Sequence, residues 1–182
     1  MRIVGGRLRG RPLKAPASRD TRPTTDRLRE ALFNVLAHAY GDAADGARVL
    51  DLFAGSGALG IEAVSRGAAF ALFVEEAVEA RALIRENVEA LGLTGTTRIF
   101  RRDATRLGPC PASEAYSLVF CDPPYGKGLA EAALLSARDG GWLSPGALIV
   151  VEEKAGAFAA LEGFTVLEQR RYDETELTFL ET

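Results

Sequence analysis

The chain contains little cysteine and almost no histidine. Its 182 residues include two cysteines, Cys110 and Cys121, and a single histidine, His38. The cysteines lack the spacing of a disulfide framework or a metal site, so neither is expected. A chain of this length buries enough apolar surface to fold without such cross-links. We therefore expect a protein that holds no metal and resides in the cytoplasm, where thiols stay reduced.

Long apolar runs are also absent. No stretch is apolar for long enough to predict a transmembrane helix. The first residues, Met1–Gly6, carry a positive charge but lack the apolar segment of a signal peptide. The hydrophobic fraction of 47% and the charged fraction of 26% are ordinary for a globular domain. Length and composition thus predict one globular domain that does not enter a membrane.

The net charge of −3 is unevenly distributed. Residues 1–30 hold nine basic and three acidic residues, a balance of +6, which leaves −9 for the rest of the chain. A basic segment on an acidic body favours a polyanionic partner held mainly by that segment. The alternative is a basic tail that only aids solubility. The nine basic residues are Arg2, Arg7, Arg9, Arg11, Lys14, Arg19, Arg22, Arg27 and Arg29.

Residues 1–23 differ from the remainder in pattern as well as charge. They are rich in arginine and glycine, and three prolines, Pro12, Pro16 and Pro23, exclude a helix. We interpret them as a basic N-terminal arm, in which the segments 2–4 and 8–13 can pair as a hairpin. Residues 24–182 are interpreted as the main domain.

The main domain alternates apolar strands with amphipathic helices. This order predicts an α/β fold with a mostly parallel sheet and helices on both faces. The last two strands follow each other without a long crossover, so we expect them to pair antiparallel. The seven expected strands are 49–53, 70–75, 98–101, 116–121, 147–152, 164–172 and 176–180. The expected helices run from the Thr25 cap to Ala39 and over 58–65, 77–91 and 129–137.

A glycine loop follows the first of these strands. Gly55, Gly57 and Gly60 have the spacing G-x-G-x-x-G. Between a strand and a helix, this spacing lets the backbone turn sharply and approach a ligand closely. The glycines alone do not identify the ligand. Asp51, ahead of the loop, suits a positively charged amino-acid group and would repel a pyrophosphate.

Two further acids follow strands, at the edge where open α/β sheets bind ligands. Glu75 lies 20 residues after Gly55 and can accept hydrogen bonds from both hydroxyls of a ribose. Asp103 follows the next strand and can accept a hydrogen bond from an adenine amino group. By itself, Asp103 could equally cap a helix. The acids together indicate a ligand that contains adenosine.

The sequence Asp122-Pro123-Pro124-Tyr125 follows the fourth strand directly. Two successive prolines form a stiff turn whose carbonyls remain available as acceptors. The Asp122 carboxylate and the Pro123 carbonyl can bind the two hydrogens of an exocyclic amino group and direct its lone pair at a methyl donor. Tyr125 can stack on a base. A purely structural turn is the alternative, but the glycine loop earlier in the chain favours the methylation site.

These motifs resemble those of known enzymes. The segment 51–60 resembles the cofactor loop of class I S-adenosylmethionine methyltransferases, and 122–125 resembles their amino-methylating motif, (Asp/Asn)-Pro-Pro-(Tyr/Phe). Two more segments, Arg2-Ile3-Val4-Gly5-Gly6 and the run from Arg22 to Asn34, are similar to those of the bacterial RsmD family, the 16S ribosomal RNA guanine-N2 methyltransferases. The resemblance covers nearly the whole chain.

The resemblance implies a Rossmann-like class I fold. It also implies that S-adenosyl-L-methionine donates a methyl group to N2 of one guanine in 16S rRNA, within the assembled or assembling small ribosomal subunit. The implied catalytic residues are Asp122, Pro123, Pro124 and Tyr125. The implied cofactor contacts are Asn34, Asp51, Phe53, Ala54, Gly55, Ser56, Gly57, Glu75, Asp103 and Ala104. The implied RNA contacts are Arg2, Arg7, Arg9, Arg11, Arg22 and Arg29.

Other functions remain open at this stage. A DNA or RNA methyltransferase acting on adenine N6 or cytosine N4 could share both motifs, and Asp122 does not separate guanine from adenine. DNA enzymes usually need an added region that reads base edges, for which this chain has little room. A protein-glutamine methyltransferase would not need the basic arm. A nicotinamide-dependent oxidoreductase would leave Asp51 and the motif 122–125 unexplained, and a noncatalytic RNA-binding protein would not need intact motifs.

Changing Arg7, Arg9 and Arg11 together to alanine is expected to weaken RNA binding and to flatten its salt dependence. Each lost phosphate contact removes part of the counterion release that drives binding. Filter binding at several salt concentrations measures the slope. An unchanged slope would exclude the arm from the phosphate contacts.

Overall fold

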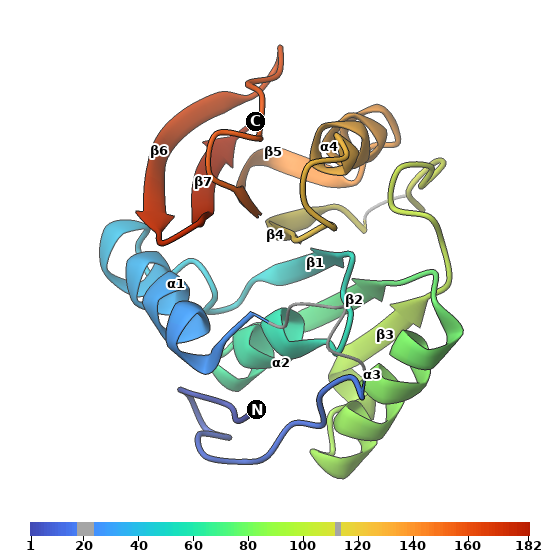
Figure 1. Cartoon of the computed structure of the whole chain (residues 1–182). Coiled ribbons are helices and arrows are strands. Elements are labelled where there is room, and N and C mark those ends of the chain that lie inside the picture. Colours follow the sequence, from blue (N-terminus) through green and yellow to red (C-terminus); the bar gives the residue numbers. More distant parts are fainter. Residues whose placement is uncertain (18–23, 112–113) are drawn as a thin grey trace.

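A seven-stranded sheet forms the centre of the computed structural model, which describes residues 1–17, 24–111 and 114–182. The strand order is β3-β2-β1-β4-β5-β7-β6 (Figure 1). The strands are β1 (Arg48–Leu52), β2 (Phe70–Val74), β3 (Thr97–Phe100), β4 (Tyr116–Cys121), β5 (Leu143–Lys154), β6 (Thr165–Tyr172) and β7 (Thr175–Glu181).

The sheet is parallel from β3 to β5, and β7 and β6 continue it antiparallel. This confirms the predicted α/β fold and the antiparallel pairing of the last two strands. The main difference is that β5 begins at Leu143 rather than at Ala147. Leu143 pairs with Tyr116 across an irregularity in the β4–β5 register, which allows this strand to extend backwards.

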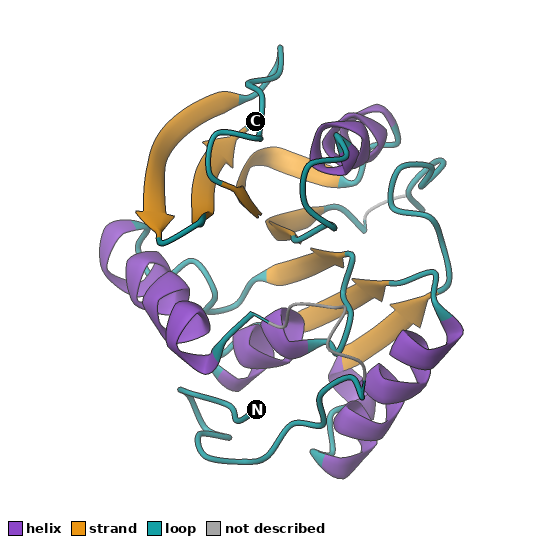
Figure 2. Ribbon diagram, in the orientation of Figure 1, coloured by secondary structure: helices purple, strands orange, loops and turns teal. Residues whose placement is uncertain are grey.

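Helices cover both faces of the sheet (Figure 2). The helices α1 (Asp26–Ala39), α2 (Ala58–Ser65) and α3 (Val78–Ala90) pack on one face, and α4 (Leu129–Asp139) packs on the other. A short 3-10 turn, η1 (Thr94–Thr96), precedes β3. Thr25 caps α1 as predicted, because its hydroxyl accepts a hydrogen bond of 3.1 Å from the Leu28 amide. None of the helices in the described part of the chain is long and apolar enough to cross a membrane.

Alternation along the strands divides the core between the two faces. On β1, Val49 packs toward α1–α3, whereas Leu50 and Leu52 pack toward α4. Neighbouring strands keep this register, so Phe120 of β4 joins the first core and Cys121 the second. Strands buried on both sides read as continuous apolar runs, which is why the sequence showed no alternation there.

The N-terminal arm is packed against the main domain. A single antiparallel bridge joins Arg2 to Pro12, as expected for a small hairpin. Ile3, Leu8 and Leu13 are buried and belong to the same core as α1–α3. Arg2, Arg7, Arg9 and Arg11 remain exposed. Arg22, another predicted RNA contact, lies outside the described residues.

Arg29 does not contact RNA in this fold, contrary to the prediction. Its side chain is fully buried, and its guanidinium donates to Asp26 at 2.9 Å and to Glu62 of α2 at 3.4 Å. It also donates to the Arg2 carbonyl of the arm. The cause is its position on α1, three residues before Leu32 and thus on the buried face. The residue instead ties the arm to α1 and α2.

Replacing Arg29 by alanine is expected to reduce the free energy of unfolding by about 3–5 kcal/mol, because it leaves the buried Glu62 carboxylate short of a partner. The matched control is Arg27→Ala, since Arg27 is exposed on the same helix; its effect should stay within about 0.5 kcal/mol. Urea denaturation measures both. Equal effects of the two changes would contradict the structural role of Arg29.

Candidate active site

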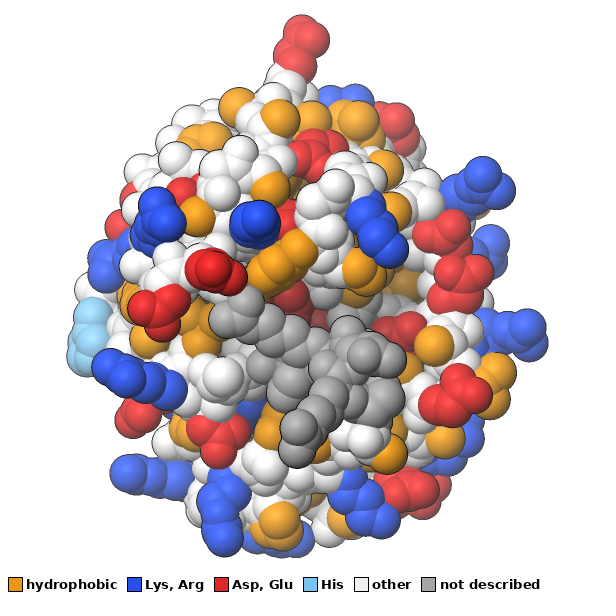
Figure 3. Space-filling view, viewed as in Figure 1, with side chains coloured by type: hydrophobic (Ala, Val, Ile, Leu, Met, Phe, Trp, Pro, Cys, Tyr) orange, Lys and Arg blue, Asp and Glu red, His pale blue; other side chains and the backbone are white. Residues whose placement is uncertain are grey.

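Acidic side chains gather where the parallel strands end. Asp51 is the last residue but one of β1, Glu75 follows β2, Asp122 follows β4 and Glu152 lies near the end of β5. Parallel strands in register place these ends at one edge of the sheet. Figure 3 shows acidic atoms beside the grey atoms near the centre of the view.

Asp51 is almost completely buried, with 1% of its surface exposed. Its Oδ2 accepts a hydrogen bond of 3.0 Å from the Gly60 amide at the start of α2. A Cβ at residue 60 would lie 2.5 Å from the Phe73 ring, so only glycine permits this approach. Burial raises the pKa of Asp51 to about 8, the Glu75 carboxylate adds to this rise, and the Gly60 amide opposes it. The carboxyl group is therefore suited to a cationic ligand group that would restore its charge.

The glycine loop turns through three left-handed residues. Phe53, Gly55 and Gly57 have φ values of +58°, +59° and +81°. The Gly55 amide donates to Glu75 Oε2 at 2.8 Å, and the Ala77 amide donates to Glu75 Oε1 at 3.0 Å. Glu75 thus fixes the loop between β1 and α2 while it stays partly exposed. The structure brings Asp51, the loop and Glu75 together as the sequence indicated.

Asp103 lies in a turn beyond β3. Its Oδ1 accepts hydrogen bonds from the Thr105 amide at 2.9 Å and from the Thr105 hydroxyl at 2.7 Å. The Thr105 hydroxyl, followed by the Thr105 amide, holds the pKa of Asp103 below its ordinary value. Asp103 therefore stabilises a turn and not a helix, which was the alternative. Ala104 next to it is buried.

Asn34 lies on α1 and not on one of the strands that carry this cluster. It is exposed on the outer face of α1, one turn beyond the exposed Glu30. The buried residues of α1 instead include Phe33 and Leu36, on the opposite side of the helix. Its role as a cofactor contact therefore stays a prediction.

Asn87 of α3 is a site residue that the sequence reasoning missed. Its amide nitrogen donates to the Ser56 carbonyl of the glycine loop at 3.0 Å. The same side chain accepts from the Lys14 amide at 2.8 Å and donates to the Lys14 carbonyl at 3.2 Å. An amide side chain on the apolar face of a helix, between Ile84 and Val88, was the available signal.

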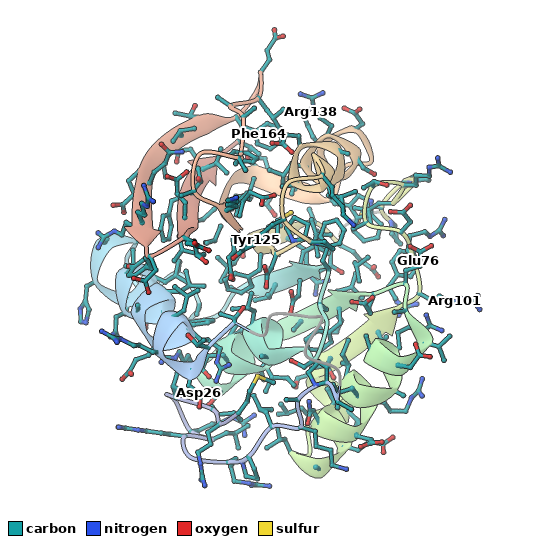
Figure 4. All side chains as sticks on the ribbon, viewed as in Figure 1. Asp26, Glu76, Arg101, Tyr125, Arg138 and Phe164 are labelled. Carbon is teal, nitrogen blue, oxygen red and sulfur yellow. The ribbon has the colours of Figure 1, made fainter. Side chains whose placement is uncertain are left out.

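The segment 122–125 forms the second half of the site. Asp122 is half-buried, Pro123 is buried and Pro124 is exposed. Tyr125, labelled near the centre of Figure 4, points its hydroxyl to Thr175 Oγ1 at 2.9 Å and to Glu152 Oε1 at 3.3 Å. Contacts from β5 and β7 thus hold the aromatic ring in place.

Two residues next to Asp122 were not predicted as site residues. Thr24 is buried, and its hydroxyl lies 3.1 Å from Asp122 Oδ2 and 3.0 Å from Glu152 Oε2. Burial, followed by the nearby Glu152 carboxylate, raises the pKa of Asp122 well above its usual range, and the Thr24 hydroxyl opposes this rise. The available signal was the pair Glu152-Glu153 at the end of an apolar strand, where both acids are buried.

The arrangement offers two different chemical environments at one edge of the sheet. The half around Asp51, the glycine loop and Glu75 offers a buried acid and backbone groups. The half around Asp122 and Tyr125 offers oxygen acceptors beside an aromatic ring. Within residues 1–17, 24–111 and 114–182, no group of three or more histidine, cysteine, aspartate or glutamate side chains is placed to hold a metal ion.

The sheet order and the placement of the helices are those of the class I methyltransferases. The model of a family described as Conserved hypothetical protein 95 matches residues 1–181. The chain belongs to this family, which is the RsmD family that the sequence motifs resemble.

Individual relatives agree with this membership. Ribosomal RNA small subunit methyltransferase D of Escherichia coli K12 is 42% identical over 154 residues, which span 85% of this chain and 75% of the relative. The Haemophilus influenzae protein of the same name is 34% identical over 173 residues, spanning 93% of this chain and 88% of the relative. A solved structure described as a candidate methyltransferase, yhhF of Escherichia coli, covers 100% of this chain and 97% of its own, with a TM-score of 0.84 and 34% identity.

Proposed function

We propose that this protein transfers a methyl group from S-adenosylmethionine to the exocyclic N2 of a guanine in small-subunit ribosomal RNA. The observation that carries the proposal is the position of Asp122 beside the glycine loop, with Pro123 and Tyr125 following it. The names of the relatives, which act on small-subunit rRNA, support the substrate class.

The residues around Asp51 fit the donor. S-adenosylmethionine, when bound, supplies a methyl group on a positively charged sulfur and carries a cationic amino group and a ribose. The buried Asp51 carboxyl, whose pKa is about 8, gains charge when a cation lies beside it. Glu75 Oε1 and Oε2 lie at the loop where ribose hydroxyls would donate. At Gly55 a Cβ would meet nothing within 4 Å, which indicates open space beside the loop.

The residues around Asp122 fit the acceptor. A guanine amino group has a lone pair that is delocalised into the ring, so it is a weak nucleophile. The ionised Asp122 carboxylate and the Pro123 carbonyl would accept its two hydrogens and direct the lone pair at the methyl carbon. As the N–C bond forms, the nitrogen gives up one proton, which Asp122 is placed to accept. Tyr125 would stack on the base.

The exposed arginines of the arm support an RNA partner. Arg7, Arg9 and Arg11 are exposed, although the arm itself is anchored by buried Ile3 and Leu8. A folded polyanion such as the assembled or assembling small subunit presents phosphates that such an arm can contact. We place the target guanine next to Asp122 and the surrounding RNA along the arm.

Incubation with radiolabelled S-adenosylmethionine and small ribosomal subunits that lack the modification tests the function. We expect label in N2-methylguanosine after digestion of the RNA. Asp122→Ala should abolish the transfer and leave cofactor binding nearly unchanged, because the residue contacts the acceptor. Label in methylated adenosine or cytidine, or only in a DNA or protein control, would contradict the guanine assignment. Near wild-type turnover by Asp122→Ala would contradict the role of that residue.

Cofactor binding should release protons near neutral pH. At pH 7 the Asp51 carboxyl is mostly protonated, because its pKa is raised to about 8. A bound ammonium group lowers this pKa and ionises Asp51, so binding of S-adenosylhomocysteine releases up to about one proton. Calorimetry in buffers of different ionisation enthalpy measures the release. The matched control is Asp51→Asn, which cannot ionise. A binding enthalpy independent of the buffer would contradict this assignment.

A further inference from the structure

The Thr24 hydroxyl connects two carboxyl groups. Its oxygen lies 3.1 Å from Asp122 Oδ2 and 3.0 Å from Glu152 Oε2. A hydroxyl group has one proton, so it can donate to one of these oxygens at a time. The other contact is favourable only when that carboxyl group carries a proton of its own. The ionisation of Asp122 and that of Glu152 are therefore linked through Thr24.

The strand register makes this arrangement a fixed part of the fold. Cys121 of β4 pairs with Val151 of β5 in a parallel ladder, so the next residues lie side by side, Asp122 just after β4 and Glu152 still within β5. Thr24 immediately precedes the Thr25 cap of α1, so the start of this helix holds the Thr24 hydroxyl beside the two carboxyl groups. Glu152 is 6% exposed and Thr24 8% exposed, so water screens their interaction only slightly.

Other elements around the two carboxyl groups also supply mainly acids and hydroxyls. Asp51 on β1 and Glu153 on β5 raise the pKa of Asp122 less than Glu152 does. The Tyr125 hydroxyl contacts Glu152 from the loop after β4, and Thr175 on β7 contacts Tyr125 in turn. Glu153 Oε1 accepts from the Gly126 and Lys154 amides at 3.0 and 2.8 Å, so its charge is partly stabilised elsewhere.

We propose that Thr24 and Glu152 are positioning residues that orient the Asp122 carboxyl group and determine when it is ionised. The inference rests on the proposed function, because a charged Asp122 matters only if it accepts hydrogens from an amino group. Thr24 favours the ionised form by donating its proton to it. Glu152 disfavours that form by placing a second negative charge beside it. Neither residue needs to touch the base.

This opposition has a measurable consequence for the acid side of the pH profile. Methyl transfer requires ionised Asp122, so kcat falls as the pH drops through the pKa of that group. Glu152→Gln removes a neighbouring charge, lowers this pKa, and should move the acid limb down by about one pH unit. Thr24→Val removes the stabilising donor and should move the limb in the opposite direction, to higher pH. Thr24→Ser keeps the hydroxyl and should restore the wild-type limb.

The control must be a buried threonine away from Asp122. Thr178 of β7 is 1% exposed and its hydroxyl accepts from Gln169, so Thr178→Val makes the same chemical change without contact to the pair. In the Thr178→Val variant, kcat should fall on the acid side at the same pH as in the wild-type protein. Thermal unfolding of each variant identifies any that does not fold. In that case Thr24→Ser and Glu152→Gln still test the inference.

A second measurement does not depend on activity. Titration of the ¹³C-labelled aspartate carboxyl groups by NMR, with Asp122→Asn to assign the signal, follows Asp122 directly. The same opposite shifts are expected in Glu152→Gln and Thr24→Val. If the variants are slower but neither the pH profile of kcat nor the NMR titration of Asp122 shifts, both residues have only a structural role. That result would overturn the inference. Shifts in the NMR titration of a protein that methylates no guanine would instead contradict the proposed function alone.

Discussion

The site depends on the parallel alignment of β1, β2, β4 and β5, which brings the ends of four strands to one edge of the sheet. Each of these strands ends in or near an acid. The fold therefore brings together carboxyl groups whose negative charges repel one another. Burial raises the pKa of Asp51, and the Gly60 amide donates a hydrogen bond to its carboxyl group. Glu75 is held by two backbone amides. Asp122 shares the Thr24 hydroxyl with Glu152. This set of buried and partly buried acids is what the proposed function assigns to a cationic donor and an amino acceptor.

The N-terminal arm is joined to this edge by buried polar contacts. Arg29 links the arm to α1 and α2, and α2 starts at the glycine loop. Asn87 links Lys14 of the arm to Ser56 of the same loop. The arm therefore belongs to the packing around the glycine loop, while its exposed arginines face outward. The surface proposed to bind RNA and the loop proposed to bind the cofactor thus share the same supporting residues.

Much of the fold was accessible from the sequence because its signals are local. The alternation of strands and helices, the Thr25 cap and the loop at Gly55–Gly60 each follow from residues close in the chain. They gave the sheet correctly, and they also gave the position of Asp51 and Glu75 beside the loop. The error was Arg29, which is buried, whereas Asn34 on the same helix stays a prediction. Both were assigned by family position, whereas helical spacing would have placed Arg29 with Leu32 on the buried face.

The residues that were missed make contacts between distant parts of the chain. Thr24 meets Asp122 and Glu152 across 98 and 128 residues, and Asn87 meets Lys14 across 73. No local pattern specifies which strand ends become neighbours, because the strand order 3-2-1-4-5 is a property of the whole sheet. A buried polar residue on an apolar face gives a hint that such a contact exists. It does not name the partner.

A crystal structure of the protein with S-adenosylhomocysteine and a guanine nucleotide would test the central claim most directly, namely that one acidic edge divides donor from acceptor. The account predicts the ammonium group on the Asp51 side, the ribose hydroxyls on Glu75, and the guanine amino group between Asp122 and the Pro123 carbonyl. Ribose hydroxyls bound away from Glu75, or a guanine whose amino group faces away from Asp122, would contradict it.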